Sequence, residues 1–413
     1  MIVEHVTCLG CGCACDDIAV TVEGDRIVDA RLACELGVAW FGDGVLPREI
    51  RSEGRSALLE SALRAAATLL TKAQRPLVYL AGDLTCEAQR EGVGLADRLH
   101  ALFDTTASDT VAASILAAQR RGRAGATLGE IRQRADLLVF WAVDPAVRYP
   151  RYSSRYAVDP SGLQTPNGRK SRTLFAVDVG EALALRDADA RLALPAELEI
   201  DALAVMRAVV LGRTPPGAGA LAGAVDLAER MLQARYVALV VDAEPSALAP
   251  DPARPEGLVA LAQALNGPTR CALSTLRAGG NRSGAEAVAT WQTGFPFAID
   301  FAGGVPRYRP SDGAAAALAQ GGVDAALVLG TPGSVPEPVS AGLAQVPCVA
   351  VGPRASTAPF RSAVTIDTGL PGVHEAGMAF RMDDVPLPLR ALIPTPQTTA
   401  QVVRSLARLV AEQ

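Results

Sequence analysis

The chain begins with a cysteine-rich stretch that runs Cys8-Leu9-Gly10-Cys11-Gly12-Cys13-Ala14-Cys15-Asp16-Asp17. With Cys34, five of its eight cysteines fall within the first 34 residues. Taking Cys8, Cys11, Cys15 and Cys34 gives the spacing C-x2-C-x3-C-x18-C. Four thiolates in such a group suit a cubane iron–sulfur cluster, and they also suit tetrahedral zinc. Thiols that bind no metal, and disulfides, are the alternatives.

A predicted hairpin connects the first cysteines to Cys34. The β-rich runs 18–22 and 27–30 flank the turn sequence Glu23-Gly24-Asp25-Arg26. Folding back at this turn would return Cys34 to the neighbourhood of Cys8. We therefore expect residues 1–52 to form a small cysteine-rich β lobe that has little core of its own.

The rest of the chain alternates between helical segments and short runs that are apolar throughout. Such runs, separated by helices, are typical of parallel sheets covered on both faces. The sequence thus predicts an α/β fold with two parallel-sheet domains, residues 53–213 and 214–413 with a C-terminal segment, divided by the break at Thr214-Pro215-Pro216-Gly217. Strands are predicted at 77–82, 136–142, 174–179, 237–242, 271–274, 326–330, 348–351 and 363–366, and helices at 56–72, 87–103, 199–211, 256–265 and 313–319.

Composition limits the class of protein. A net charge of -5 and a pI near 5.4 argue against a nucleic-acid-binding surface, which is usually basic. No run reaches the roughly 20 apolar residues of a membrane helix, and no signal peptide is visible, so we expect a cytoplasmic protein with reduced cysteines. The scattered Cys86, Cys271 and Cys348 are predicted to be core thiols.

Two segments are candidates for ligand binding. Gly279-Gly280-Asn281 follows the strand predicted at 271–274 and so lies at a strand's carboxyl end, where Arg277 and Arg282 are suited to hold phosphate. A plain tight loop is the alternative. The second segment, residues 148–156, alternates arginine with tyrosine and is either an anion- or partner-binding segment or a solvated loop. No P-loop motif is present, and the three histidines share no motif.

Several strings resemble the B subunit of formylmethanofuran dehydrogenase, which belongs to the molybdopterin oxidoreductase superfamily. The resemblance implies the fold of that superfamily over nearly the whole chain. The strings are residues 8–18 at the cysteines, 126–131 (Ala-Thr-Leu-Gly-Glu-Ile), 135–138, 150–156, 290–301 and 380–387.

Two active-site positions of that family depart from its pattern here. Redox members resemble one another in a Cys-His or selenocysteine-His pair upstream of the T-L-G-E-I string, and the cysteine binds tungsten or molybdenum. The matching positions are Thr110, whose hydroxyl is no soft ligand, and Val111, which cannot relay a proton. The family's arginine is matched by Arg277, but its neighbouring histidine is replaced by Gly279.

This pattern resembles the B subunits of the formyltransferase/hydrolase complexes of methylotrophic bacteria. The resemblance implies a non-catalytic scaffold that binds the hydrolase (A), formyltransferase (D) and C subunits. Such a complex moves formyl groups from tetrahydromethanopterin to a methanofuran-type carrier and releases formate. We then expect no tungstopterin or molybdopterin, only a remnant cofactor pocket at Arg277, Gly279, Gly280 and Asn281, and a structural [4Fe-4S] cluster or zinc at the N-terminal cysteines.

Two other functions stay open on the sequence. One is an active tungsten- or molybdenum-dependent formylmethanofuran dehydrogenase subunit with an iron–sulfur cluster, in which Thr110 or Ser108 replaces the metal-binding thiolate. The other is an unrelated nucleotide-binding α/β protein, for which the N-terminal cysteines would have no role.

Overall fold

The computed structural model describes residues 1–214, 219–247 and 249–413. Two compact units divide the chain: unit 1 holds Met1–Thr110 and Ala278–Gln413, and unit 2 holds Val111–Arg277. Unit 2 is therefore an insertion in the sequence of unit 1. The domain boundary predicted after residue 213 falls within the range of unit 2, and residues 215–218 of the predicted break lie outside the described residues.

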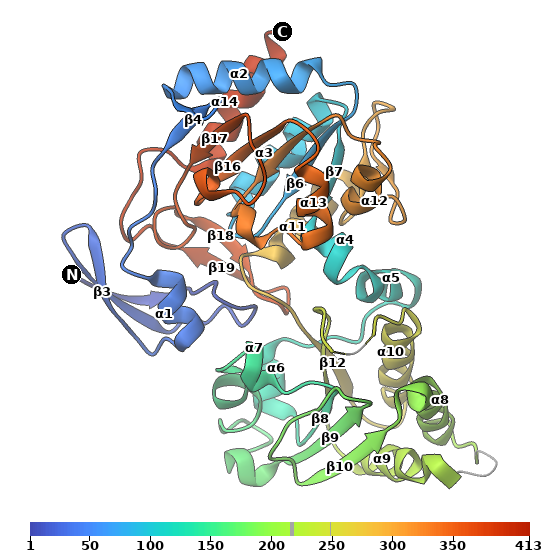
Figure 1. The fold of residues 1–413 in the computed structure, drawn as a ribbon. Helices are drawn as coiled ribbons and strands as arrows, with labels where there is room; N and C mark the ends of the chain where they lie inside the picture. The colour runs from blue at the N-terminus through green and yellow to red at the C-terminus, as the bar shows by residue number, and fades with distance from the viewer. Residues whose placement is uncertain (215–218, 248) are drawn as a thin grey trace. The chain divides into compact units, whose positions relative to one another are not determined.

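A three-stranded antiparallel sheet forms the N-terminal lobe of unit 1. Its order is β1 (Ile2–Val6), β2 (Ile18–Glu23) and β3 (Arg26–Arg31), and helix α1 (Glu35–Phe41) packs on β3. Figure 1 shows this lobe in blue. Val20 lies opposite both Val3 and Ala30 in the sheet register. The predicted hairpin is confirmed by the pairing of β2 with β3.

A nine-stranded sheet forms the centre of unit 1. Its middle strands run parallel, and shorter strands add antiparallel at both edges. In spatial order the strands are β14 (Arg307–Tyr308), β13 (Ile299–Asp300), β7 (Leu102–Thr105), β6 (Pro76–Leu80), β15 (Ala325–Leu329), β16 (Cys348–Gly352), β17 (Val364–Asp367), β4 (Ile50–Ser52) and β5 (Arg55–Ser56).

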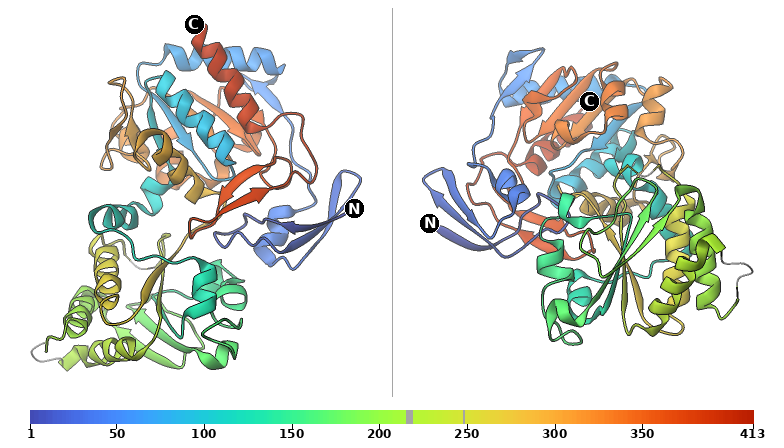
Figure 2. Two further views of the ribbon diagram at one scale, coloured as in Figure 1. Left: turned by 180° about the vertical axis from the view of Figure 1, so that it is seen from behind. Right: turned by 60° about the horizontal axis from the view of Figure 1, so that its bottom comes forward.

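Helices cover this sheet on both faces because its central strands are apolar on both faces. In β6, Val78 and Leu80 face one helix layer, whereas Leu77 and Tyr79 face the other. The first layer consists of α2 (Leu59–Lys72), α3 (Cys86–Arg98), α11 (Arg282–Thr293) and α14 (Thr399–Ala411), as Figure 2 shows in its left panel. The second layer includes α12 (Ala314–Ala319) and α13 (Glu337–Leu343).

The helix predicted over 87–103 is wrong beyond Arg98. The chain turns at His100, whose φ of 50° is left-handed, and Leu102–Thr105 then form strand β7 beside β6. The apolar Ala101-Leu102-Phe103 run suits a buried helix end as well as a buried strand. Periodicity over so few residues therefore cannot separate the two.

Unit 2 is built on a five-stranded parallel sheet. In spatial order its strands are β10 (Ala190–Leu194), β9 (Thr173–Val179), β8 (Leu137–Trp141), β11 (Val237–Asp242) and β12 (Cys271–Leu276). One face packs against α8 (Glu199–Val210), α9 (Ala222–Gln233) and α10 (Ala253–Leu265). None of the helices in the described ranges has the length and apolar character that a membrane crossing requires.

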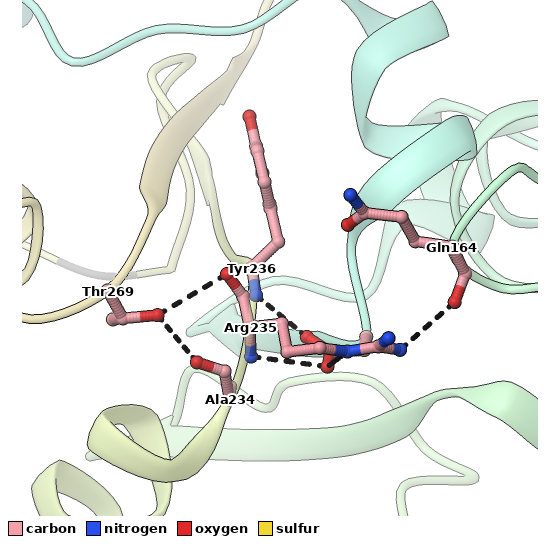
Figure 3. Close-up of polar contacts among 6 residues, drawn as sticks. Gln164, Ala234, Arg235, Tyr236 and Thr269 are labelled. Atoms are coloured by element: carbon pink, nitrogen blue, oxygen red, sulfur yellow. Dashed lines mark hydrogen bonds and ion pairs between the residues drawn. The ribbon is translucent and has the colours of Figure 1, made fainter.

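A carboxylate sets the register of β8 against β11. Asp136, just before β8, accepts hydrogen bonds from the amides of Arg235 at 3.2 Å and Tyr236 at 2.9 Å. The Arg235 guanidinium also bonds Asp136 and reaches the carbonyl oxygen of Gln164 at 3.1 Å, so that one side chain joins three segments (Figure 3). The two strands therefore start level with each other.

Candidate functional site

The cysteine segment of unit 1 is a closed loop. The amide of Cys8 donates to the carbonyl oxygen of Cys15 at 2.9 Å, and the amide of Ala14 donates to that of Cys11 at 3.2 Å. The amide of Gly10 lies 3.4 Å from the Cys8 sulfur, within reach of an N–H···S hydrogen bond. These bonds hold the first group of thiols on one short turn of chain.

The Cys8 thiol interacts electrostatically with the thiols at the other three predicted ligand positions. Burial raises the pKa of the Cys8 thiol well above its ordinary value, while the Gly10 amide lowers it by a smaller amount. Cys11, Cys15 and Cys34 each raise the pKa of Cys8 further through electrostatic repulsion. The hairpin thus returns Cys34 to the other three, as the spacing predicts.

The donor set suits a soft metal by type, although the thiols do not converge on one point. Within residues 1–214, 219–247 and 249–413, no three His, Cys, Asp or Glu side chains are arranged to hold a metal ion. A fifth thiol, that of Cys13, is completely buried in the same loop. A hydrogen bond with Cys11 and burial raise its pKa well above the ordinary value.

The Gly-rich loop docks on the cysteine segment. The amide of Gly280 donates to the carbonyl oxygen of Leu9 at 2.9 Å. A Cβ atom at Gly279 would overlap that same carbonyl oxygen and would lie 2.8 Å from the amide nitrogen of Cys11. Any side chain at position 279 would therefore displace the cysteine segment, and the space beside this glycine is filled by backbone.

Asn281 fastens three segments inside unit 1. Its side chain donates to the carbonyl oxygen of Leu84 at 2.8 Å and accepts from the amide of Phe380 at 2.8 Å. Its own carbonyl oxygen accepts from the Gln89 side chain at 2.9 Å. Because Asn281 is only 2% exposed, these bonds make it an internal connector of the fold.

A β-hairpin completes the support of the cysteine segment. Strands β18 (Gly377–Phe380) and β19 (Pro386–Leu389) pair antiparallel, and their buried apolar side chains pack against Leu9 and Ala14. The amide of Met382 donates to the carbonyl oxygen of Gly12 at 3.0 Å. The sequence carries no prediction of this hairpin, although residues 380–387 belong to the strings that resemble the family.

Thr110 and Ser108, the predicted counterparts of the family's metal ligand, use their hydroxyls within unit 1. Thr110 donates to the carbonyl oxygen of Thr106 at 2.9 Å, in helix α4 (Thr106–Thr110). Ser108 donates to a carboxylate oxygen of Asp104 at 2.7 Å. Val111, the first residue of unit 2, is 1% exposed. Both hydroxyls therefore satisfy neighbouring oxygens.

Arg277 lies at the carboxyl end of β12 in unit 2 and faces a carboxylate of the same unit. Its guanidinium is 3.8 Å from Glu244, and both side chains are buried. Next to them, Asp242 accepts from Arg148 at 3.1 Å and from the hydroxyl of Tyr149 at 3.0 Å. The carboxyl edge of this sheet is thus a network of internal ion pairs and hydrogen bonds.

The tyrosines of the arginine–tyrosine segment are buried within this network. Tyr149 is 1% exposed and Tyr152 is completely buried, with its hydroxyl 3.1 Å from that of Ser274. Sequence reasoning missed the carboxylates Asp242 and Glu244. Their signal was their position directly at the end of an apolar strand, where carboxyl-edge side chains gather.

Comparisons with known proteins agree with this architecture. No protein-family model matches the chain. It is 32% identical to the B subunit of the tungsten-containing formylmethanofuran dehydrogenase 2 of Methanocaldococcus jannaschii, over 96% of this chain and 95% of the relative. It is 30% identical to the corresponding protein of Methanococcus maripaludis, over 99% of each chain.

The fold and its cysteine-bearing lobe define a relative of the dehydrogenase B subunits, and at this identity and coverage the chain belongs to the family of formylmethanofuran dehydrogenase B subunits. Among solved structures, it is similar to a chain of the formyltransferase/hydrolase complex of Methylorubrum extorquens, determined with methylofuran. The TM-score is 0.73 at 26% identity, covering 88% of this chain and 99% of the other.

Proposed function

We propose that the chain is a non-catalytic structural subunit of a cytoplasmic formyltransferase/hydrolase complex that transfers formyl groups from tetrahydromethanopterin to a methanofuran-type carrier and releases formate. The observation that carries the proposal is the contact of Gly279 with Leu9. The family's histidine position holds a residue with no side chain, and backbone fills the space beside it. A proton-transferring group has no place there.

The other family positions support the same function. The hydroxyl of Thr110 donates to a helix carbonyl oxygen, and a hydroxyl binds tungsten or molybdenum less well than a soft thiolate does. The charge of Arg277 faces the Glu244 carboxylate within the same unit. This carboxylate offsets part of the positive charge that an anionic ligand would meet at Arg277.

Assembly with other subunits follows from the solved relative. The similar chain of Methylorubrum extorquens comes from a formyltransferase/hydrolase complex. We expect this chain to bind the hydrolase, formyltransferase and C subunits and to hold them in place. A large α/β protein that presents neither a nucleophile nor a metal ligand at its ligand site is suited to such a role.

The rival function is that of an active metal-containing dehydrogenase subunit, and the tungsten-containing relatives favour it. It requires Thr110 or Ser108 to replace the thiolate. Ser108 would first have to release Asp104, a buried carboxylate that it bonds at 2.7 Å. This requirement makes the rival the weaker proposal.

For the N-terminal thiols we propose a structural [4Fe-4S] cluster or zinc held by Cys8, Cys11, Cys15 and Cys34. Four cysteines are the donor type for either group. Binding would draw the four thiols together, tie Cys34 to the loop and stabilise the lobe. Iron and acid-labile sulfide, measured anaerobically, would identify a cluster, and zinc without sulfide would identify the ion. If neither is found in the purified complex, the lobe relies on packing alone.

The experiment that tests the function compares the complex with and without this chain. We expect its omission to disrupt assembly and to lower formate release. We also expect the complete complex to contain neither tungsten nor molybdenum and to show no formate-dependent dye reduction. About one tungsten or molybdenum per chain would overturn the proposal, since a family metal site holds one ion. A fully active, assembled hydrolase without this chain would also overturn it.

A further inference from the structure

We propose that the outer surface of the N-terminal lobe, formed by β3, the turn after it and α1, docks another subunit of the complex, one that presents an apolar patch with a basic rim. This inference rests on the proposed function. It assigns to residues 1–45 a binding role that is separate from the cysteine group.

Exposed apolar side chains are concentrated in this lobe. Of the fourteen large apolar side chains that are exposed in the described residues, six lie in residues 1–45, although this segment is a small part of the chain. Val28, Leu32 and Val38 are 54%, 58% and 55% exposed. Such a concentration in a soluble lobe marks an interaction surface. The other three are Met1, Ile2 and Val45.

The inner side of the lobe is already occupied, so the free side is that of β3 and α1. Leu9 and Ala14 pack against the β18–β19 hairpin. Helix α1 contacts the cysteine loop through Leu36, whose carbonyl oxygen would lie 2.6 Å from a Cβ atom at Gly10. Val38 and its exposed neighbour Ala39 therefore form an apolar outer face on α1, which lies beside β3 in Figure 1.

The charge of the lobe selects the partner. Residues 1–45 carry eight carboxylates and two arginines, a formal charge of -6, whereas the whole chain carries -5. The remainder of the chain is therefore close to neutral, and the acidic charge belongs to this lobe. The exposed carboxylates of the lobe are Glu4, Glu23, Asp25, Asp29, Glu35 and Asp43.

Three classes of occupant are disfavoured by this charge. Two copies of the lobe placed face to face would bring like charges together, and phosphate-rich nucleic acid or an anionic membrane would be repelled in the same way. A different protein subunit with basic residues around an apolar patch complements both the charge and the apolar centre. Complementary charge also speeds the encounter of such partners.

The test uses the tagged full-length chain expressed with the hydrolase, formyltransferase and C subunits. The readout is the molar amount of each subunit retained per tagged chain. We expect the double variant Leu32→Asp/Val38→Glu to lower retention of one subunit at least about tenfold, since truncating or charging a central contact costs that much in typical interfaces. Asp also tolerates the left-handed φ of 68° at Leu32.

The matched control is Leu163→Asp, which places a charge at a side chain of unit 2 that is 84% exposed. The amount of each subunit that this variant retains should stay within about twofold of the wild type. The variant Asp25→Lys/Asp29→Lys changes only exposed carboxylates and preserves the apolar residues. We expect it to slow the association of the chain with that subunit about tenfold. The rate of this association should also lose most of its dependence on salt concentration between about 0.05 and 0.5 M.

If the folded Leu32→Asp/Val38→Glu variant retained every subunit as well as the wild type does, the inference would be overturned. The same holds if the Asp25→Lys/Asp29→Lys variant associated with the subunit at the wild-type rate. The charge variant decides the matter if the apolar variant fails to fold. Failure of the proposed function is recognised separately, because it requires that the other subunits assemble without this chain. If omission disrupts the complex while both lobe variants assemble normally, only the docking surface is wrong.

Discussion

The amide of Gly280 donates to the carbonyl oxygen of Leu9 at 2.9 Å, and this bond joins the Gly-rich loop to the cysteine segment. The two segments belong to different parts of the sequence of unit 1, on either side of the inserted unit 2. The contact makes the cysteine lobe part of the body of unit 1. It also places backbone against Gly279, so the loop supports the lobe.

The first prediction concerns the close approach at Gly279. In Gly279→Ala the new Cβ would overlap the Leu9 carbonyl oxygen, and we expect a loss of about 1–3 kcal/mol in the free energy of unfolding. Gly279→His, which introduces the residue expected for the family at this position, should cost more because the ring is larger. Urea denaturation of the purified chain measures both.

Gly94→Ala is the control for this comparison, because a Cβ atom at that helical glycine meets no atom within 4 Å. It should leave stability unchanged or raise it by up to about 1 kcal/mol. If Gly279→His were as stable as the wild type, the space beside the loop would be open and the structural role of the contact would be refuted.

The second prediction concerns the buried pair of Glu244 and Arg277. In Glu244→Gln the guanidinium stays buried without its facing carboxylate, and we expect a loss of about 2 kcal/mol or more in the free energy of unfolding. Adding Arg277→Met to that variant should recover part of the loss. A double-mutant cycle followed by urea denaturation gives the coupling.

A partly exposed carboxylate of unit 2 serves as the comparison for this cycle. Glu256 is 26% exposed and pairs with Arg120 at 2.9 Å and Arg121 at 3.5 Å, whose side chains are 58% and 40% exposed. Glu256→Gln should therefore change the free energy of unfolding by no more than about 0.5 kcal/mol. A Glu244→Gln variant that behaves like this control would mean that the buried pair contributes little to the stability of unit 2.

The sequence alone predicted the parts of the fold that depend on local pattern. Strands β6 and β11 are apolar at nearly every position, and Gly or Pro bounds many such runs, so their type and location follow from composition. Strand β7 was not predicted because its first residues, Leu102 and Phe103, continue the apolar pattern of the preceding helix. The contacts of Asp136 with Arg235 and Tyr236 could not be predicted from the sequence because they depend on which strands become neighbours.

The candidate site was predictable by residue type but not by contact. The cysteine spacing identified the thiols that interact with Cys8. A glycine at position 279 was visible in the sequence, but the backbone of Leu9, which leaves no room for a side chain there, lies 270 residues earlier. Likewise Arg277 was identified, whereas its facing carboxylate Glu244 lies just after the neighbouring strand β11. Predicting tertiary contacts of this kind requires the order of the strands in the sheet, which cannot be read from a single sequence.

The third prediction concerns Asn281. Asn281→Ala would remove the side-chain bonds to the Leu84 carbonyl oxygen and the Phe380 amide, and we expect a loss of about 2–4 kcal/mol in the free energy of unfolding because both partners are left unsatisfied. Asn281→Gly removes the same bonds without strain at the left-handed φ of 58°. It should be about 1 kcal/mol more stable than the alanine variant. If Asn281→Gly were as stable as the wild type in urea denaturation, these hydrogen bonds would contribute nothing to the free energy of unfolding.

The last prediction concerns pH. Glu375 is 1% exposed, and its carboxylate accepts from the amide of Thr399 at 2.7 Å and from the Thr399 hydroxyl at 3.1 Å. Burial is the largest influence and raises the pKa of Glu375 from 4.5 to about 7, against the opposing effect of the Thr399 bonds. Between these two values the folded chain holds a proton that the unfolded chain has released.

Raising the pH through this window therefore lowers the contribution of Glu375 to stability, by about 3 kcal/mol in total, and above pH 7 the loss is complete. In Glu375→Gln the position no longer titrates. The difference in the free energy of unfolding between variant and wild type should then shift in favour of the variant by about that amount from pH 4.5 to 7.5. The exposed Glu197→Gln is the control, with a difference that stays within about 0.5 kcal/mol. Chemical denaturation at several pH values measures these differences, and a flat Glu375→Gln difference would mean that the carboxyl group ionises normally in the folded chain.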